Sequence, residues 1–578
     1  MNHQWSLNAL YKGYQDPQYQ KDVSIYQELL LQFSQYIETM NDSESSIKEG
    51  LKLLEKEYDY HYRLKIYSLL IQTMDSTNKE ALHELQKISN LQSSYSSFII
   101  KIQNHLGSTS IQSTDPFLLE YQYYLERLKN KQKYTLNPLQ EDILSALYPS
   151  TLKSMSDMYY HLTSSAHHEC LGQDMTLTQI KNLCHDTSQD VRKEAFLKEM
   201  ACYEHIAEPL SFSINNIKKQ QLYISRLRGY QDPLDQMLKE SDMKKETLDV
   251  MMEAIEDYLP IFQEYLATKA KKLGHENGMP WYDLYATIGE CSYHFTIEEC
   301  EEMILHYFLN VDDSLYQMTK RAFDEKWIDY PSHQGKQGGA FCENLAWIQE
   351  SRLMTNYNST FSDVVTAAHE LGHAYHGHMI EHHRPLNREY CMPLAETASM
   401  FNENIIYNSF YQTADQKNQM FILDIQLSAL CQVVCDIYAR YTFEKSIFEN
   451  IEKGFLFADD LNKLMIFALK KAFGKGLDEK WLHPYRWITK VHYYIPDIAY
   501  YNFPYTFGAL FARGLYAMYQ NDHAFFKDYQ ELLKASTTHT VEETAMIAGI
   551  DLTKKDFWIQ SLESIHQQML QYIKLLEL

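Results

Sequence analysis

The residues best suited to chemistry lie in the segment 364–373, VVTAAHELGH, which contains the pattern H-E-x-x-H. His369 and His373 are four positions apart, so on a helix both imidazoles project from one face and can reach a single metal ion. Glu370 projects beside them, where its carboxylate can hydrogen-bond a water molecule instead of the metal. Neutral imidazoles suit Zn²⁺, and a catalytic zinc site combines three protein ligands with one open position. The pattern therefore predicts one Zn²⁺ per chain, with Glu370 as the general base.

A third ligand is expected downstream, and the candidate is Glu396 in the segment 392–403, MPLAETASMFNE. Pro393 suits the first position of a helix, which puts Glu396 in the first turn, where the helix dipole favours an ionised carboxylate. Glu403 lies seven positions later, on the same face two turns on. It can hydrogen-bond a ligand histidine from behind, or it can be a solvated surface group, and the sequence weights the two interpretations equally.

An all-histidine zinc site is an alternative to Glu396. Four more histidines follow the motif: His376, His378, His382 and His383. The corresponding pattern, H-E-x-x-H-x-x-G-x-x-H, requires glycine at position 376 and histidine at position 379. This chain has His376 and Met379. The all-histidine site is therefore disfavoured, and Glu396 is preferred.

A second cluster near the C-terminus, the segment 492–508 (HYYIPDIAYYNFPYTFG), combines His492 with five tyrosines. Hydrolysis of an amide creates an oxyanion, and a metal usually shares its stabilisation with a donor such as Tyr or His. This proline-containing loop can supply such donors. On this segment alone, an aromatic wedge in the core is the favoured interpretation.

The elements that must position these residues are mostly helical. A buried helical face is indicated by Val23, Tyr26, Leu29, Leu30, Phe33 and Ile37. The sequence predicts helices over about 23–37 and 47–74, and a third helix that begins after the capping segment 75–78. The H-E-x-x-H segment is itself expected on a helix capped by Ser362 or Asp363.

Convincing strand patterns are confined to the segment 340–357. Ala340–Ile348 and Arg352–Tyr357, separated by three residues, are predicted to form a hairpin. The preceding segment 330–339, YPSHQGKQGG, is the richest glycine cluster of the chain, but it lacks the order of a phosphate-binding loop. Its glycines instead permit close approach to a strand or to an extended ligand. The polar segment 164–178 is expected to be a surface turn.

Composition and charge limit the class of protein. A chain of 578 residues is too long for one ordinary core, and 45% hydrophobic with 22% charged residues excludes disorder. With 19 glycines and 14 prolines, a turn-dense all-β architecture is disfavoured. The formal net charge of −24 repels nucleic-acid backbones and anionic lipids, so we expect neither nucleic acid nor a membrane as partner.

The sequence also bears on the location of the protein. The first 22 residues lack the apolar core of a signal peptide, and the best candidate for a membrane span, Phe503–Tyr519, contains Arg513. The cysteines are scattered along the chain. We therefore expect a cytoplasmic protein without a membrane span.

Together, the zinc segment, the Glu396 segment and the tyrosine loop resemble the oligoendopeptidase F / thimet oligopeptidase family of zinc metallopeptidases. In that family the third ligand is a Glu at a similar distance after the second histidine, and here Glu396 follows His373 by 23 positions. Further matching segments are 227–230, 281–283, 335–340 and 355–357. The resemblance covers the chain well from about residue 200 to the C-terminus and is weaker before that point.

The resemblance implies a mainly α fold, in which two helical lobes enclose a deep substrate channel and a small β-sheet lies beside the zinc site. Residues 1–200 would form a helical wall of the channel, and residues 201–578 the catalytic domain. The family cleaves internal bonds of short, unfolded peptides, so short peptides are the expected substrates. The hairpin 340–357 would hold the substrate backbone by β-addition, and Gly338, Gly339 and Ala340 are the expected substrate-binding residues.

The resemblance also assigns roles within the tyrosine loop. The residues that match the transition-state residues of the family are His492, Tyr501 and Tyr505. Tyr494 and Tyr500 are rivals, because the spacing after the histidine varies among subfamilies. The position of one further tyrosine in thimet-type members is Ala509 here.

Two other functions remain open on the sequence. A zinc exopeptidase, such as a carboxypeptidase or dipeptidyl carboxypeptidase, would need a cation to hold the terminal carboxylate of its substrate. The candidates for that cation are Arg352, Arg384, Arg486 and Arg513. A non-catalytic helical scaffold that binds peptides and uses zinc structurally is less favoured, because Glu370 and an open ligand position indicate catalysis.

Overall fold

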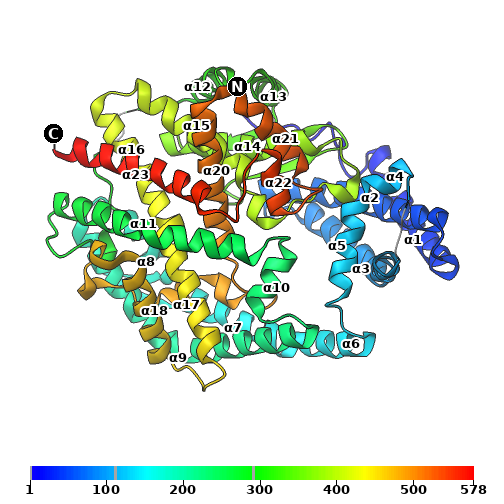
Figure 1. The fold of residues 1–578 in the computed structure, drawn as a ribbon, viewed down its shortest axis with the longest axis horizontal. Coiled ribbons are helices and arrows are strands. Elements are labelled where there is room, and N and C mark those ends of the chain that lie inside the picture. Colours follow the sequence, from blue (N-terminus) through cyan, green and yellow to red (C-terminus); the bar gives the residue numbers. More distant parts are fainter. Residues whose placement is uncertain (1–2, 110–112, 290–292, 578) are drawn as a thin grey trace.

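The computed structural model describes residues 3–109, 113–289 and 293–577, and helices dominate it (Figure 1). The helices before the central sheet are α1 Pro17–Thr39, α2 Glu44–Met74, α3 Lys79–Ser108, α4 Pro116–Glu120, α5 Gln122–Gln132, α6 Pro138–Leu147, α7 Leu152–Ser165, α8 Leu177–Asn182, α9 Gln189–Arg228, α10 Pro233–Glu240, α11 Lys245–Lys272, α12 Ile297–Leu309 and α13 Asp313–Asp324. Those after it are α14 Phe361–Ile380, α15 Thr397–Thr413, α16 Gln416–Cys431, α17 Ile437–Asn450, α18 Ala458–Phe473, α19 Arg486–Thr489, α20 Phe503–Asn521, α21 Phe526–Ala535, α22 Val541–Ile547 and α23 Lys555–Glu577. The strands are β1 His167–Cys170, β2 Gln173–Thr176, β3 Ile328–Pro331, β4 Phe341–Leu345 and β5 Glu350–Tyr357. The predicted mainly α class with a small sheet is confirmed.

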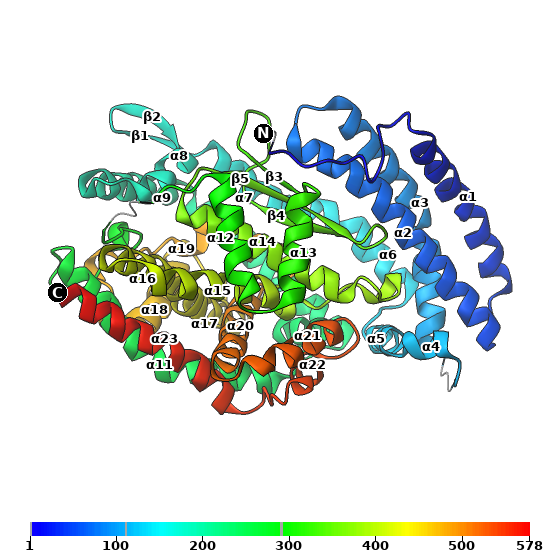
Figure 2. The same cartoon turned by 90° about the horizontal axis from the view of Figure 1, so that it is seen from above.

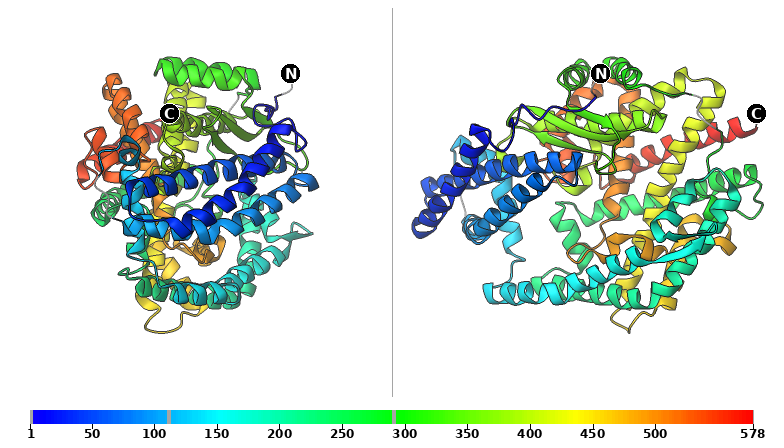
Figure 3. Two further views of the ribbon diagram at one scale, coloured as in Figure 1. Left: turned by 90° about the vertical axis from the view of Figure 1, so that its right-hand side faces the viewer. Right: turned by 180° about the vertical axis from the view of Figure 1, so that it is seen from behind.

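The first three helices form a bundle with its own hydrophobic core. Each begins at a side-chain cap, because Asp16, Ser43 and Asn78 accept hydrogen bonds from the backbone of the first turn. Aromatic and aliphatic side chains of all three helices pack together in this core. Figures 2 and 3 show the helices side by side on one flank of the molecule. The predicted helices and the capping segment 75–78 are confirmed.

A second, larger core extends from Leu152 to Leu576. Its helices form two sets in Figure 1, with α12–α15 and α20–α22 in the upper part and α7, α9, α17 and α18 in the lower part. Helix α9 ends at Gly229, whose φ of +100° is a left-handed conformation that glycine adopts without a steric penalty. The larger core begins before residue 200, and the division of the chain into domains 1–200 and 201–578 stays a prediction.

The central sheet has the strand order β3-β5-β4. β4 pairs antiparallel with β5, with Phe341 opposite Met354, so the predicted hairpin is confirmed. β3 was not predicted from sequence and pairs parallel to β5, with Ile328 opposite Leu353. β1 and β2 form a hairpin that projects from the molecule (Figure 2), so the expectation of a plain surface turn was wrong there. Those two strands escape prediction because they are short and mostly exposed, without a buried alternating face.

Strand β4 joins the N-terminal bundle to the larger core. Leu345, at the end of β4, is fully buried in the core of the bundle. The neighbouring Glu343 accepts a hydrogen bond of 2.7 Å from the hydroxyl of Tyr62 on α2. On the other side, the Asn344 amide donates to the backbone carbonyl of His373 at 3.3 Å. The sheet is therefore fastened both to the bundle and to the helix that carries the H-E-x-x-H motif.

Among the described residues, one helical run, Gln416–Asn450, is long and apolar enough to cross a membrane by length and composition alone. In its most apolar window, 56% of the residues are buried inside the protein, as they are in a core helix. The run is therefore weak evidence for a membrane span, and the expected absence of a span stays a prediction.

Candidate active site

Helix α14, Phe361–Ile380, carries the H-E-x-x-H motif and is capped by Thr360, two or three residues before the predicted caps. The Thr360 hydroxyl accepts from the backbone of Asp363, and the Asp363 carboxylate accepts in return from the backbone of Thr360. The prediction of Ser362 or Asp363 as the cap was wrong, because Asp363 is the reciprocal partner within a capping box. Gly372 lets α14 approach α15 closely, since a Cβ there would lie 2.4 Å from the Cα of Ser399.

Three side chains place their donor atoms as close together as the ligands of one metal ion. One ligand atom each from His369, His373 and Glu396 lies within 4.8 Å of the others. The Nε2 atoms of His369 and His373 lie 3.4 and 3.5 Å from Oε2 of Glu396. Ligands about 2.05 Å from a tetrahedral zinc are about 3.3 Å apart, whereas a direct N–H···O bond is usually about 2.9 Å. Donor types and spacing therefore both fit a divalent cation such as Zn²⁺.

Glu396 occupies the N-cap position of α15, not its first turn as predicted. Met392–Leu394 form a separate 3-10 turn that contains Pro393, and the regular helix begins at Thr397. The carboxylate is held by Ser399, whose hydroxyl donates to Oε2 of Glu396 at 2.9 Å. Ser399 was missed from sequence, although a hydroxyl three positions after a helix-start carboxylate is a recognisable local signal.

Glu403 lies behind His369, one of the candidate metal ligands. Its Oε1 atom is 2.6 Å from Nδ1 of His369, which leaves Nε2 directed toward His373 and Glu396. Although burial opposes it, the hydrogen bonds to Glu396 and Glu403 raise the pKa of His369, to about 10. Burial likewise opposes the shift of Glu396, but the hydrogen bond from His369 and the charges of His373 and His369 lower its pKa to about 2. A cation bound here would replace a proton on His369, as expected when metal binding couples to protonation.

Glu370 is the remaining carboxylate of the motif and is almost fully buried, with 5% of its surface exposed. Its Oε2 atom has no hydrogen-bond partner among the described residues. Burial raises the pKa of Glu370 to about 7; the nearby His369 opposes this shift, and the carboxylates of Glu396 and Glu403 add to it. A carboxyl group with such a pKa can both accept and release a proton near neutral pH.

The tyrosine loop brings His492, Tyr501 and Tyr505 together. The His492 ring stacks on Tyr501 at 4.8 Å between centroids, and Tyr505 lies 6.2 Å from His492 and 5.8 Å from Tyr501. All three side chains are partly exposed. Helix α20, which carries Tyr505, packs against Glu396, since a Cβ on Gly508 would lie 3.0 Å from Cβ of Glu396. The structure therefore brings this trio next to the proposed metal ligands.

The rival tyrosines lie in the core. Tyr494 is fully buried and stacks on Tyr159 at 4.1 Å, and its hydroxyl has no partner among the described residues. Tyr500 is buried against Tyr441 and Phe448. The core-wedge interpretation thus fits these two residues, while the three half-buried residues remain the candidates for contact with substrate. Ala509 is also buried and offers no hydroxyl.

His492 has an unexpected partner, Arg440 on α17. A terminal nitrogen of the Arg440 guanidinium donates to Nδ1 of His492 at 2.5 Å. Burial and the charges of Arg440 and Lys490 lower the pKa of His492 to about 4, so the ring is neutral and its proton resides on Nε2. Arg440 precedes His492 by 52 positions, and no local pattern in the sequence links them.

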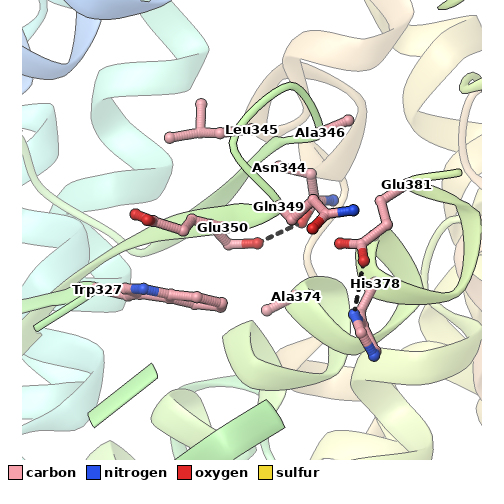
Figure 4. A pocket seen from close by; sticks show the side chains of 11 residues that line it. Trp327, Asn344, Leu345, Ala346, Gln349, Glu350, Ala374, His378 and Glu381 are labelled. Atoms are coloured by element: carbon pink, nitrogen blue, oxygen red, sulfur yellow. Dashed lines mark hydrogen bonds and ion pairs between the residues drawn. The ribbon is translucent and has the colours of Figure 1, made fainter. Parts of the chain in front are cut away.

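Three of the four histidines after the motif are engaged elsewhere, and the fourth, His382, is 74% exposed. His376 is fully buried, lies 2.8 Å from the Ser536 hydroxyl and stacks on Tyr390. His383 lies 2.8 Å from the Thr537 hydroxyl. His378 and Glu381 form an ion pair of 3.2 Å beside a cavity (Figure 4).

The cavity in Figure 4 is not a peptide site. It lies between the β4–β5 turn and the C-terminal half of α14, and its lining includes Asn344, Gly377 and Glu381. Its volume of about 10 Å³ corresponds to a single water molecule.

The glycine-rich loop, His333–Gly339, is anchored by a buried lysine. Lys336 forms an ion pair of 2.6 Å with Asp329 of β3, and both side chains are fully buried. Lys336 also donates to the carbonyl of Thr355 at 2.6 Å, so it fastens the loop to the sheet and is not free to bind phosphate. At the end of the loop, Gly338 and Gly339 have open space around them, and the Asn356 amide donates to the carbonyl of Gly339. The following Ala340 is half-buried and leads directly into β4.

Comparison with known proteins identifies relatives along nearly the whole chain. A family model described as peptidase family M3 matches residues 182–564, more than half of the chain. Among curated proteins, group B oligopeptidase PepB of Streptococcus agalactiae is 24% identical, covering 89% of this chain and 88% of its own length. Oligopeptidase PepF of Bacillus subtilis is 22% identical, with coverage of 96% and 84%.

Solved structures share the fold. A crystal structure titled as a putative peptidase from Chlamydophila abortus superimposes with a TM-score of 0.86 at 19% identity, covering 99% of this chain and 98% of that one. Oligoendopeptidase-F from Enterococcus faecium gives a TM-score of 0.70, also at 19% identity, with coverage of 96% and 99%.

Proposed function

The chain belongs to peptidase family M3, and from that premise we propose that it is a zinc-dependent endopeptidase that hydrolyses internal bonds of short, unfolded peptides. One observation carries the proposal: three donor atoms of His369, His373 and Glu396 converge beside the buried carboxyl group of Glu370. The names of the relatives, oligopeptidase and oligoendopeptidase, support short peptides as the substrate class.

In this mechanism His369, His373 and Glu396 hold the zinc ion, Glu403 orients His369, and Ser399 orients Glu396. When bound, Zn²⁺ supplies Lewis-acid polarisation of the scissile carbonyl and lowers the pKa of a water molecule. The side chains of His369 and Glu396 are each oriented by a hydrogen bond to another side chain. His373 is positioned by its helix, because α14 packs closely against α15.

The proton transfers are assigned to Glu370. Its carboxylate accepts a proton from the attacking water and delivers it to the leaving amine. Its burial and unpartnered oxygen support this role, because a group with no other hydrogen bond among the described residues is free to bind the water. As negative charge develops on the carbonyl oxygen, the Nε2–H of His492 and the hydroxyl of Tyr505 or Tyr501 donate hydrogen bonds to it.

The substrate backbone is assigned to the edge of the sheet. β4 is an edge strand, paired only with β5 among the described strands, so its other edge is available for an extended peptide. Gly338, Gly339 and Ala340 precede this edge, where the absence of large side chains permits close approach. We also propose a cytoplasmic location, without nucleic-acid or membrane partners. The net charge of −24 and the free thiols of the described cysteines support it.

A set of peptides of graded length, with free and with blocked ends, tests the proposal when the products are identified by mass spectrometry. We expect internal cleavage of short peptides even when both ends are blocked, by protein that contains one zinc per chain. Cleavage that requires a free end would identify an exopeptidase instead. No cleavage by fully zinc-loaded protein would favour a peptide-binding scaffold.

A further inference from the structure

Beyond His492, four basic side chains lie close together, and three of them face one buried carboxylate. We call Lys181, Arg440, Arg486 and Lys490 the cationic cluster; they come from α8, from α17, from α19 and from the residue that ends α19. Arg440, Arg486 and Lys490 share the neighbour Asp436, which lies on a single π-helical turn, Gln432–Asp436, between α16 and α17. Such turns interrupt regular helices and occur often at functional sites.

Arg486 is the member of the cluster that hydrogen-bonds to Asp436. Arg486 donates to Oδ1 and Oδ2 of Asp436 at 3.1 and 3.0 Å. Arg440 and Lys490 approach Oδ2 only to 3.9 Å. The remaining carboxylate nearby, Glu199, interacts with Lys181 and with His483. Among the described residues, Asp436 thus faces three of the cations and Glu199 the fourth, in a chain whose formal net charge is −24.

Lys490 has one weak ion pair, to Asp436 at 3.9 Å. Its ammonium group donates no hydrogen bond to any residue that the structure describes, and 26% of its side chain is exposed. Burial and the positive charge of Arg486 lower the pKa of Lys490 to about 7. Arg440 likewise has a buried Nε atom without a partner among the described residues. Both cations thus have N–H donors for which no described residue accepts, as a bound anion would.

The cluster adjoins the residues assigned to the reacting carbonyl group. Lys490 precedes His492 by two positions, and Arg440 hydrogen-bonds the His492 ring directly. The His492 ring stacks on Tyr501, and Tyr501 contacts Tyr505. Tyr505 lies on α20, which packs on Glu396. These contacts connect Lys490 and Arg440, through His492 and the two tyrosines, with the proposed metal site.

We propose that Lys490, supported by Arg440, binds a carboxylate of the peptide substrate. The inference rests on the proposed peptidase function and adds a specificity-determining residue to it. The carboxylate is the C-terminal group of a short peptide or the side chain of an Asp or Glu residue, since both present the same two acceptor oxygens to an ammonium group. None of the four arginines considered from sequence fills this role alone: Arg352 is engaged with Glu350, Arg384 with Glu55 and Glu120, Arg513 with Asn404, and Arg486 with Asp436.

The experiment compares matched peptides that differ in one charge. One pair has a free or an amidated C-terminus, and a second pair, amidated throughout, has Glu or Gln at successive positions after the cleaved bond. We expect wild-type kcat/KM to be about tenfold or more higher for the carboxylate member of at least one pair, the size of a charge-assisted hydrogen bond. The pair that responds identifies the source of the carboxylate.

Variants assign the preference to Lys490. Lys490→Met should reduce the carboxylate preference to within about twofold while the neutral peptides are still cleaved, and Lys490→Arg should keep most of it. Lys463→Met, at a lysine that is 77% exposed on α18, is the matched control and should leave the preference unchanged.

Two results would overturn the inference while leaving the proposed function intact: equal cleavage of both members of every pair by the wild type, or an undiminished preference in Lys490→Met. If the wild type cleaves none of the peptides, the proposed function is itself wrong and the inference fails with it. The wild-type ratio tests the proposal independently of how well any variant folds.

Discussion

The two halves of the candidate site are built by different means. On the metal side, His369, His373 and Glu396 project from two helices that touch backbone to backbone at Gly372, and Ser399 and Glu403 hydrogen-bond the ligand side chains. On the loop side, His492 and the two tyrosines lie on a 3-10 turn, on the residues before α20 and in its first turn, and contact one another mainly through their rings.

The difference corresponds to what each half must do. Metal ligands have to be held within about 0.5 Å of their working positions, which a rigid pair of helices provides. Donors to a developing negative charge need a hydrogen at the right place only when the charge forms, which partly exposed side chains on a loop can supply. Substitutions in the two halves should therefore fail differently: one half should lose metal or fold, and the other should lose rate.

The largest effect is expected for Glu370→Gln. Glutamine keeps the size of the side chain but cannot accept the proton of the water, so kcat should fall by about 10³-fold. Because Glu370 is not a ligand, zinc content measured by atomic emission should remain one per chain. Glu531→Gln, at a glutamate that is 60% exposed, is the control. Turnover close to wild type would remove Glu370 from the mechanism.

On the loop side, Tyr505→Phe should lower kcat by about 10²-fold with little change in KM, because the hydroxyl acts only when charge develops on the carbonyl. Zinc content should not change. Tyr494→Phe is the matched control, since it removes a buried hydroxyl without a partner among the described residues and should leave kcat intact. An unchanged kcat in Tyr505→Phe would assign the donor role to Tyr501 or to His492 alone.

On the metal side, Glu403→Gln should weaken zinc binding about 10- to 100-fold. The amide oxygen can still accept from Nδ1 of His369, but the negative charge that makes the imidazole a better ligand is lost. Competition with a fluorescent chelator measures the affinity, and Glu479→Gln, 71% exposed, is the control. With zinc in excess, kcat should recover; a kcat loss that zinc does not reverse would contradict a purely orienting role.

The smallest effect is expected for Gly372→Ala. The new Cβ would lie 2.4 Å from Cα of Ser399 and 2.5 Å from the carbonyl oxygen of Ala398, so α14 and α15 must separate. Crowding of this kind costs about 1–3 kcal/mol, and the better helix propensity of alanine returns part of it. Denaturant unfolding should show a net loss of about 1–2 kcal/mol.

Gly338→Ala is the comparison for that measurement. A Cβ added at Gly338 would have no atom of another residue within 4 Å, and the backbone there lies outside the left-handed region. The free energy of unfolding should therefore change by less than about 0.5 kcal/mol. Equal stability of the two variants would mean that the contact between α14 and α15 does not hold the ligands in place.

The same contrast explains what the sequence could predict. The spacing of His369 and His373 has meaning in any helix, so the motif and its convergence with Glu396 could be anticipated from local geometry. The exact start of α14 could not, because Thr360 competes with nearby polar residues as the cap and only the backbone geometry decides between them.

Residues that act across long separations were missed. Arg440 meets His492 only through the packing of α17 against the tyrosine loop, and no motif marks it. Lys490 lies two positions before His492, but no motif marks it either. β3 was missed for a similar reason. It is four residues long and pairs in parallel with β5, from which a loop and β4 separate it in the sequence. Such a pairing has no turn motif in the sequence by which it could be predicted.

The burial of Leu345 in the N-terminal bundle has a consequence for recombination between related genes. If the segment before the central sheet were exchanged for that of a relative, Leu345 and Glu343 would stay behind. Leu345 is part of the core of the bundle, and Glu343 is hydrogen-bonded to it. The transferable unit is therefore discontinuous: α1–α5, whose side chains share this core, together with the end of β4, which follows only after α13 and β3. A chimaera made by exchanging only a continuous N-terminal segment would place the bundle of one protein against the β4–β5 hairpin of another. The mismatch would lie at the sheet edge that is proposed to bind the substrate.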